Sequence, residues 1–172
     1  MERKQVHTAY GVITALLMIV INVVMLLTGN QDNKAINWIA FLPFLGGIIA
    51  CCVAYSKANN KLVTFGQVFS SGFKASALIA IIIIIWSFLS LYIWPDIQTR
   101  AIEKASLDME SKHMDQAQID QAIGITRKYF KVFMAAGALF STLFFGAIFS
   151  LIGAAVAPKK GVPHNPQVTQ KF

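Results

Sequence analysis

The stretch IIIIIWSFLSLYIWPD, residues 81–96, decides the fold, because it holds five consecutive isoleucines and no charge before its final aspartate. It belongs to a longer charge-free run, residues 75–95. A helix needs about 20 apolar residues to cross roughly 30 Å of hydrocarbon. In lipid the backbone must satisfy its own hydrogen bonds, so a single long run is helical even where β-branched residues would favour a strand in water. The run therefore predicts a membrane-spanning helix.

Three other runs, residues 6–28, 35–56 and 132–158, also lack Asp, Glu, Lys and Arg. Only 13% of the 172 residues are charged, against roughly 25% in soluble domains, which argues against a soluble helical core. We predict an all-α, polytopic membrane protein with four transmembrane helices and a short amphipathic helical segment on the outer side. The predicted single domain covers residues 1–158, with spans at about 6–28, 36–56, 72–94 and 129–156.

The first run is not expected to be a cleaved secretory signal. The apolar region of such a signal is about 7–15 residues long and ends in small residues at a cleavage site. Here the run is longer, and Thr28, Gly29 and Asn30 make a poor site. We expect this helix to stay attached as the first span.

The distribution of charge predicts the orientation. An even number of spans puts both termini on one side, together with the connection between spans two and three. That side carries eight Lys and Arg residues and one acid, Glu2, whereas the other side carries seven of each sign. Because Lys and Arg near span ends favour the cytoplasm, we expect both termini to be cytoplasmic, in a bacterial cytoplasmic (inner) membrane.

The polar segments beside the third span have helical features. Phe65, Phe69 and Phe73 recur every four residues, which fits either an interfacial helix or the first turns of the third span. At the far end, Trp94 suits head-group depth and Pro95 interrupts the helix, so the helix ends or kinks there.

The outer segment, residues 96–128, contains apolar residues at helical spacing and opposite charges four residues apart. We predict two short amphipathic helices, broken near His113, with Asp115 opening the second one. The second helix is expected to run on into span four, with Gly124 as a weak point. Residues 159–172 are predicted to form a flexible cytoplasmic tail.

No catalytic, cofactor-binding or metal-binding residue is predicted, and no cofactor. The two cysteines, Cys51 and Cys52, are adjacent in a predicted helix and cannot easily bridge. No span carries an acidic or basic residue in its middle, although functional membrane sites usually do. Asn22 is expected to make an interhelical hydrogen bond. A polar cavity would instead indicate transport if it were lined by Asn22, Ser87, Ser90 or Thr142.

Small residues recur every four positions on two spans. Such stripes let helix backbones approach closely, and we expect them to pack within the monomer, with packing between chains as the alternative. The stripes are Gly46, Ala50 and Ala54 on span two, and Gly146, Ser150 and Ala154 on span four.

Several segments together resemble a known family. These are TFGQVFSSGFKASALIA (residues 64–80), LYIWPDI (91–97) and GAIFSLIGAAVAPKK (146–160). The chain is similar, over nearly its whole length, to a bacterial family of four-span inner-membrane proteins found mainly in Bacteroidetes-type bacteria and known only as a domain of unknown function. The resemblance implies four helices in the cytoplasmic membrane and no enzyme activity.

The leading functional hypothesis is a non-enzymatic accessory or scaffolding protein of the bacterial envelope that acts through helix packing. The alternatives are a small oligomeric transporter or channel and a membrane enzyme acting on a lipid-linked substrate. The expected partners are the lipid bilayer and either a second copy of the chain or another membrane protein. Nucleic acid is not an expected partner, because most of the excess positive charge lies at span ends.

Overall fold

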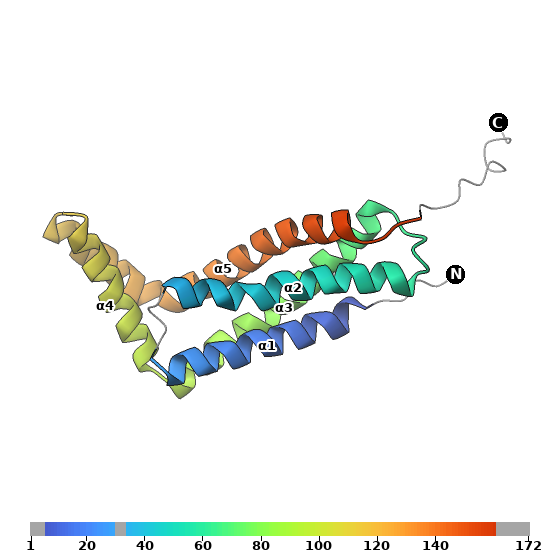
Figure 1. Ribbon diagram of the computed structural model, residues 1–172. Helices are drawn as coiled ribbons and strands as arrows, with labels where there is room; N and C mark the ends of the chain where they lie inside the picture. The colour runs from blue at the N-terminus through green and yellow to red at the C-terminus, as the bar shows by residue number, and fades with distance from the viewer. Residues whose placement is uncertain (1–5, 30–33, 161–172) are drawn as a thin grey trace. The chain divides into compact units, whose positions relative to one another are not determined.

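The computed structural model describes residues 6–29 and 34–160, with the backbone alone for residues 34–40. Within these residues the regular elements are all α-helices, which confirms the predicted all-α class. Figure 1 shows their order along the chain, which is α1 (His7–Leu27), α2 (Lys34–Ala58), α3 (Phe65–Ile93), α4 (Asp96–Ser111) and α5 (Gln116–Val156).

Four stretches of helix are long and apolar enough to cross a membrane. They are His7–Leu27, Phe41–Ala58, Phe65–Ile93 and Gln116–Val156. On α1, large apolar side chains remain exposed, which water would disfavour and lipid accepts. They are Val12, Ile13, Leu16, Leu17, Val20, Val24 and Leu27. The four predicted membrane helices are therefore present, and their exposed apolar faces suit contact with a bilayer.

The bounds of two helices bear on alternatives that the sequence left open. α3 begins at Phe65 and continues without interruption, so the phenylalanine-rich segment forms the first turns of the long third helix. At the other end α3 stops at Ile93, and Pro95 is the N-cap residue of α4, so the chain ends one helix there and starts another. The predicted tail lies mostly outside the described residues, since it runs from 159 to 172.

The chain divides into two compact units. Unit 1 comprises Met1–Ala80 and Thr142–Phe172, and unit 2 comprises Ile81–Ser141. Unit 1 therefore holds α1, α2, the first half of α3 and the end of α5. This division does not test the predicted single domain of residues 1–158, which stays a prediction.

Small residues allow the helices of unit 1 to pack closely. A Cβ atom placed on Gly72 of α3 would lie 2.7 Å from Cys52 Sγ and 2.8 Å from Ser150 Oγ, so α3 meets both α2 and α5 there. A Cβ atom on Gly153 of α5 would also lie 2.7 Å from Cys52 Sγ. On the α1 side, a Cβ on Gly47 would come within 2.7 Å of Thr14 Cγ2. At these positions only glycine fits the spacing between the helices.

The predicted stripe on α5 faces the interior, but the one on α2 does not. Gly146, Ser150 and Ala154 are buried, and a Cβ on Gly146 would collide with the Ser76 side chain of α3. On α2 the expectation of packing within the monomer is wrong for Gly46 and Ala50, which are exposed. The neighbouring Gly47, with Cys51 one turn further on, takes that role, because a shift of one residue turns the helix by about 100°.

In the described part of the chain, the close packing at the α5 stripe does not involve a hydrogen bond from Ser150. Ser150 is fully buried, and its hydroxyl has no hydrogen-bond partner among the described residues. Ser76 differs, because its hydroxyl donates to the Gly72 carbonyl of its own helix at 3.1 Å. Shape, and not a polar contact between helices, sets the spacing at Ser150.

Aromatic rings complete the contact between α2 and α5. Phe44 lies edge-on to Phe149 with ring centroids 5.2 Å apart, and Phe41 lies similarly against Phe145 at 5.3 Å. Such pairs contribute roughly 0.5–1.5 kcal/mol beyond the area they bury.

In unit 2, α4 and the start of α5 form the predicted helical pair, with the break at His113. His113 adopts a left-handed backbone conformation, with φ of 57°. Its N–H donates to the Glu110 carbonyl at 2.9 Å, and the N–H of Met114 donates to the Met109 carbonyl at 3.3 Å. This pattern is a Schellman motif, which terminates α4 and turns the chain into α5.

The predicted weak point at Gly124 is wrong. The backbone of α5 departs from helical geometry at Tyr129 instead, with φ of −110° and ψ of 17°. Glycine lowers helix stability by roughly 1 kcal/mol but does not by itself break a helix. The low helix propensity of Gly124 therefore does not determine where α5 is interrupted.

Candidate functional site

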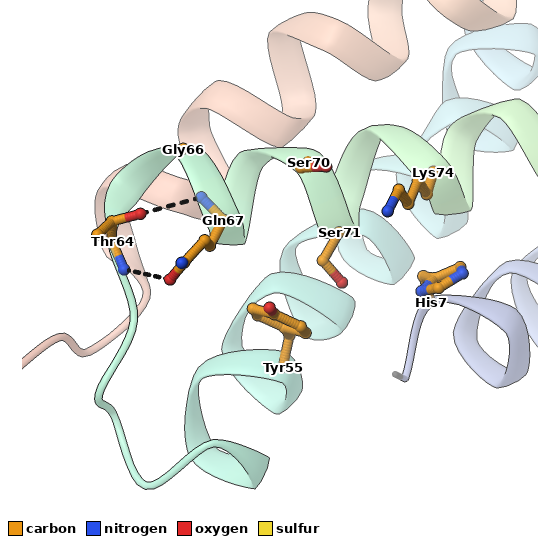
Figure 2. Close-up of a pocket in the computed structure, with 8 residues that line it drawn as sticks. All are labelled: His7, Tyr55, Thr64, Gly66, Gln67, Ser70, Ser71 and Lys74. Carbon is orange, nitrogen blue, oxygen red and sulfur yellow. Dashed lines mark hydrogen bonds between the residues drawn. The ribbon is translucent and has the colours of Figure 1, made fainter. Parts of the chain in front are cut away.

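The candidate site is a pocket at one end of unit 1, where three helices meet. Its volume is about 370 Å³, within the roughly 300–1,000 Å³ that is usual for ligand pockets. Figure 2 shows the lining residues, which are His7 of α1, Tyr55 of α2, and Thr64, Gly66, Gln67, Ser70, Ser71 and Lys74 at the start of α3.

A tight connection between α2 and α3 shapes this pocket. α2 ends in a Schellman motif, because the N–H of Asn60 donates to the Lys57 carbonyl at 3.0 Å and the N–H of Lys61 donates to the Ser56 carbonyl at 2.8 Å. Asn60 and Lys61 both have positive φ, at 58° and 63°. The chain therefore reverses within a few residues and delivers α3 beside α2.

A capping box fixes the first turn of α3. The Thr64 N–H donates to Gln67 Oε1 at 2.9 Å, and the Gln67 N–H donates to Thr64 Oγ1 at 3.3 Å. Figure 2 shows this reciprocal pair at the rim of the pocket. Two backbone donors that would otherwise lack partners are satisfied, so the start of the helix is held in place.

The end of α5 is tied to the same connection. The Ser56 hydroxyl donates to the Pro158 carbonyl, and the Lys160 N–H donates to the Lys61 carbonyl at 2.8 Å. Lys159 folds back over the last turn, where its ammonium group donates to the Ala157 carbonyl at 2.8 Å. A cation at a helix C-terminus satisfies free carbonyls and the helix dipole, so part of the basic charge at this end has a structural role.

The side chains of the pocket are polar at both floor and rim. Ser71 and Tyr55 form the buried floor, with 4% and 8% of their surfaces exposed. Ser70 and Lys74 lie at the exposed rim. Figure 2 shows Lys74 of α3 and His7, the first residue of α1, on the same side of the pocket.

The charge of this end is of one sign. Among the described residues of unit 1 (6–29, 34–80 and 142–160) there is no Asp or Glu. The basic residues at the pocket end are Lys57, Lys61, Lys74, Lys159 and Lys160. An anion entering the pocket would therefore meet a favourable potential with no opposing carboxylate in these segments.

The two cysteines of α2 beside the pocket contact polar groups of α3. Both are free and fully buried. Cys51 Sγ lies 3.9 Å from the Ser71 hydroxyl, and Cys52 Sγ lies 3.7 Å from the Val68 carbonyl. In the part of the chain that the structure describes, no three His, Cys, Asp or Glu residues group as metal ligands would.

The polar span residues that would indicate transport are not brought together in the pockets described. Ser87 and Ser90 belong to unit 2 and donate to carbonyls of their own helix, at 2.8 and 2.9 Å. Thr142 and Asn22 belong to unit 1 but do not line the pocket there. In unit 2, a groove of about 440 Å³ between α4 and α5 is lined instead by polar and apolar residues of mixed charge, including Glu103 and Arg127.

Sequence reasoning missed this pocket, although part of its signal was visible. Thr64 and Gln67 have the spacing of a capping box, which marks the start of α3. The stretch from residue 64 to 80, which carries the family resemblance, supplies six of the eight lining residues. His7 and Tyr55 lie far away in the chain, and only the packing of α1 and α2 brings them to α3.

Four long apolar helices with exposed apolar faces define a multi-pass integral membrane protein. The chain belongs to the family described as Protein of unknown function (DUF4199), whose model matches residues 9–159. Neither the curated proteins nor the solved structures provided a match. The family assignment confirms the resemblance to a domain of unknown function and brings no activity with it.

Proposed function

We propose that the chain is a non-enzymatic accessory or scaffolding protein of the bacterial inner membrane that acts through helix packing. The observation that carries this proposal is the interior of unit 1, where glycines on α2, α3 and α5 hold neighbouring helices at contact distance. Lipid tails are as apolar as leucine, so helix association in membranes depends on such close packing. A rigid bundle of this kind suits a protein that positions other membrane components.

The buried polar groups of the described residues support a structural role over transport. They are hydroxyl side chains, namely Thr14, Ser56, Ser71, Ser76, Ser90, Thr142 and Ser150. Ion and proton pathways in membranes usually depend on charged or ionisable residues inside the spans. Hydroxyls that bond to carbonyls of their own helix, as Ser76 and Ser87 do, stabilise packing and offer no relay for charge.

The basic end of unit 1 supports a cytoplasmic location for both termini. The start of α1 and the end of α5 lie at this end, together with the α2–α3 connection (Figure 1). Lys and Arg near span ends favour the cytoplasmic side. The same charge favours the anionic leaflet of a bacterial inner membrane.

Purification of the full-length chain from native membranes in mild detergent tests the scaffolding role. Light scattering would give the protein mass of the complex, for the wild type and for Gly46→Leu. Gly46 is exposed on α2, and nothing lies within 4 Å of a Cβ placed there, so this change leaves the interior of unit 1 intact.

A mass above one chain, from a second copy or a stoichiometric membrane partner, would support the proposal. If Gly46→Leu lost this additional mass while its melting temperature stayed unchanged, the contact with the second copy or partner would lie on the outer face of α2. A single chain in every preparation would contradict the scaffolding role.

A further inference from the structure

The pocket at the basic end of unit 1 has the chemistry of an anion site. Every lining residue except Gly66 carries an N–H or O–H donor on its side chain, and none carries a carboxylate. Thr64 and Gln67 already bond to each other in the capping box. The groups left to meet a ligand are the Lys74 ammonium group, the His7 imidazole and the hydroxyls of Tyr55, Ser70 and Ser71, the last of which also contacts Cys51 Sγ.

The side chains of Lys74 and His7 come from different helices and both line the mouth of this pocket (Figure 2). The ammonium group of Lys74 supplies a positive charge there, and the imidazole of His7 supplies an N–H donor. No acid among the described residues of unit 1 balances the charge of Lys74.

The backbone adds to the same preference. His7 is the first residue of α1, and Gly66 is the second residue of α3, so the N-terminal ends of two helices border the pocket. A helix N-terminus carries partial positive charge and free N–H groups, which favour anions. The absent side chain at Gly66 leaves the first turn of α3 open to the cavity, because nothing lies within 4 Å of a Cβ placed there.

We propose that this pocket binds a phosphate group, either in the head group of an anionic phospholipid or in a soluble phosphate compound. A phosphate monoester offers three non-bridging acceptor oxygens, and the phosphodiester of a phospholipid offers two with ester oxygens beside them, which suits several donors converging from three helices. Lys74 supplies the charge, His7 supplies an imidazole N–H, and Ser71 and Tyr55 supply hydroxyl groups from the floor.

The position of the pocket brings both ligand sources within reach. It lies where the candidate spans His7–Leu27 and Phe65–Ile93 begin and Phe41–Ala58 ends, which is head-group depth in a bilayer. Leu62 and Phe65, beside the rim residues, are exposed apolar side chains that can contact acyl chains. The exposed rim also admits a ligand from water. This site goes beyond the scaffolding role and does not depend on it.

Binding to the purified full-length chain in a zwitterionic detergent tests the proposal. The probes are phosphatidylglycerol, phosphatidylcholine and inorganic phosphate, and the readouts are native mass spectrometry and the shift in melting temperature. Lys74→Gln removes the charge at the pocket. Lys57→Gln is the matched control. Lys57 is exposed in the last turn of α2, at the same end of unit 1 as Lys74, but it does not line the pocket.

We expect Lys74→Gln to weaken phosphatidylglycerol binding by about tenfold, equivalent to about 1.4 kcal/mol. Lys57→Gln and the charge-retaining Lys74→Arg should bind as the wild type does, and phosphatidylcholine should bind weakly to all of them. If inorganic phosphate competed with phosphatidylglycerol, the site would also accept soluble phosphates. If it did not compete, the site would be assigned to lipid. Inorganic phosphate binding with the same dependence on Lys74, without lipid binding, would assign it to a soluble ligand.

Three results would overturn the proposal. Equal weakening by Lys74→Gln and Lys57→Gln would indicate general attraction to a basic surface. Phosphatidylcholine carries the same phosphodiester beside a fixed positive charge, so equal binding of phosphatidylglycerol and phosphatidylcholine would show that the pocket does not select an anionic ligand. Failure of the wild type to bind either phosphatidylglycerol or inorganic phosphate would show that the pocket does not bind a phosphate group.

The melting temperature of each variant, measured without ligand, tests whether the fold is retained. We expect it to be unchanged, because both substituted lysines are exposed.

Discussion

Replacing Gly146 with leucine tests the contact between α5 and α3 directly. Even the first side-chain atom of the new residue would collide with the Cβ and Oγ atoms of Ser76, and it would lie 3.4 Å from Phe44 Cζ. The remaining leucine atoms have no room between these helices. The substitution should therefore push α5 away from α3 and disturb the nearby aromatic contact between Phe44 and Phe149.

The size of the effect follows from two opposing contributions. Overpacking a close-packed site costs about 1–3 kcal/mol. Leucine has a higher helix propensity than glycine, which returns about 0.8–1 kcal/mol. Because even the Cβ atom collides with Ser76, the overpacking cost should lie near the upper end of its range, at about 2–3 kcal/mol. The expected net loss is then about 1–2 kcal/mol of unfolding free energy, or a melting temperature roughly 2–8 °C lower for a chain of this size.

The assay is thermal unfolding of the purified chain in detergent, with Gly46→Leu as the control. Both changes convert a helical glycine to leucine, but the space around Gly46 is open. We expect Gly46→Leu to leave the melting temperature unchanged or slightly higher. If both variants melted alike, the close contact at Gly146 would not exist in the folded protein, and the packing argument would be refuted.

Three further predictions concern other parts of the molecule. Ser150→Ala should raise the melting temperature, because it removes a buried hydroxyl without a hydrogen-bond partner, whereas Ser76→Ala should not, because that hydroxyl is bonded. A cysteine at Lys112 should react with an impermeant thiol reagent outside the cell and one at Lys61 should not, and the reverse pattern would refute the orientation. His113→Gly should stabilise the α4–α5 turn by about 1 kcal/mol, because glycine adopts positive φ without strain; hydrogen exchange of the flanking amides would slow, and faster exchange would contradict this account.

The membrane helices could be predicted from the sequence because their signal is local. A charge-free run of about 20 residues in lipid has few alternatives to a helix. The helices beyond the spans were also visible, since the break at His113 was predicted from the pattern of the outer segment. The continuation of the second outer helix into span four was also predicted, and α5 accordingly reaches 41 residues, about twice the length that a span needs. The interruption at Tyr129 was not predicted.

The direction in which a helix face points was harder to predict. Gly46 and Gly47 are adjacent, and each is followed four residues later by another small residue, Ala50 or Cys51. The pattern within one helix cannot tell which of the two meets a neighbour, because that depends on the other helices. The structure turns Gly47 towards Thr14 of α1 and leaves Gly46 exposed.

The pocket could not be predicted from the sequence for the same reason, because its shape depends on how neighbouring helices pack. Ser71, at the pocket floor, directly precedes Gly72, where a Cβ atom would lie 2.7 Å from Cys52 Sγ of α2 and 2.8 Å from Ser150 Oγ of α5. Any side chain at position 72 would move α3 away from α2, and the floor residues Ser71 and Tyr55 lie on these two helices. The close contacts that hold the bundle together are therefore also the contacts that set the distance between the polar groups of the pocket.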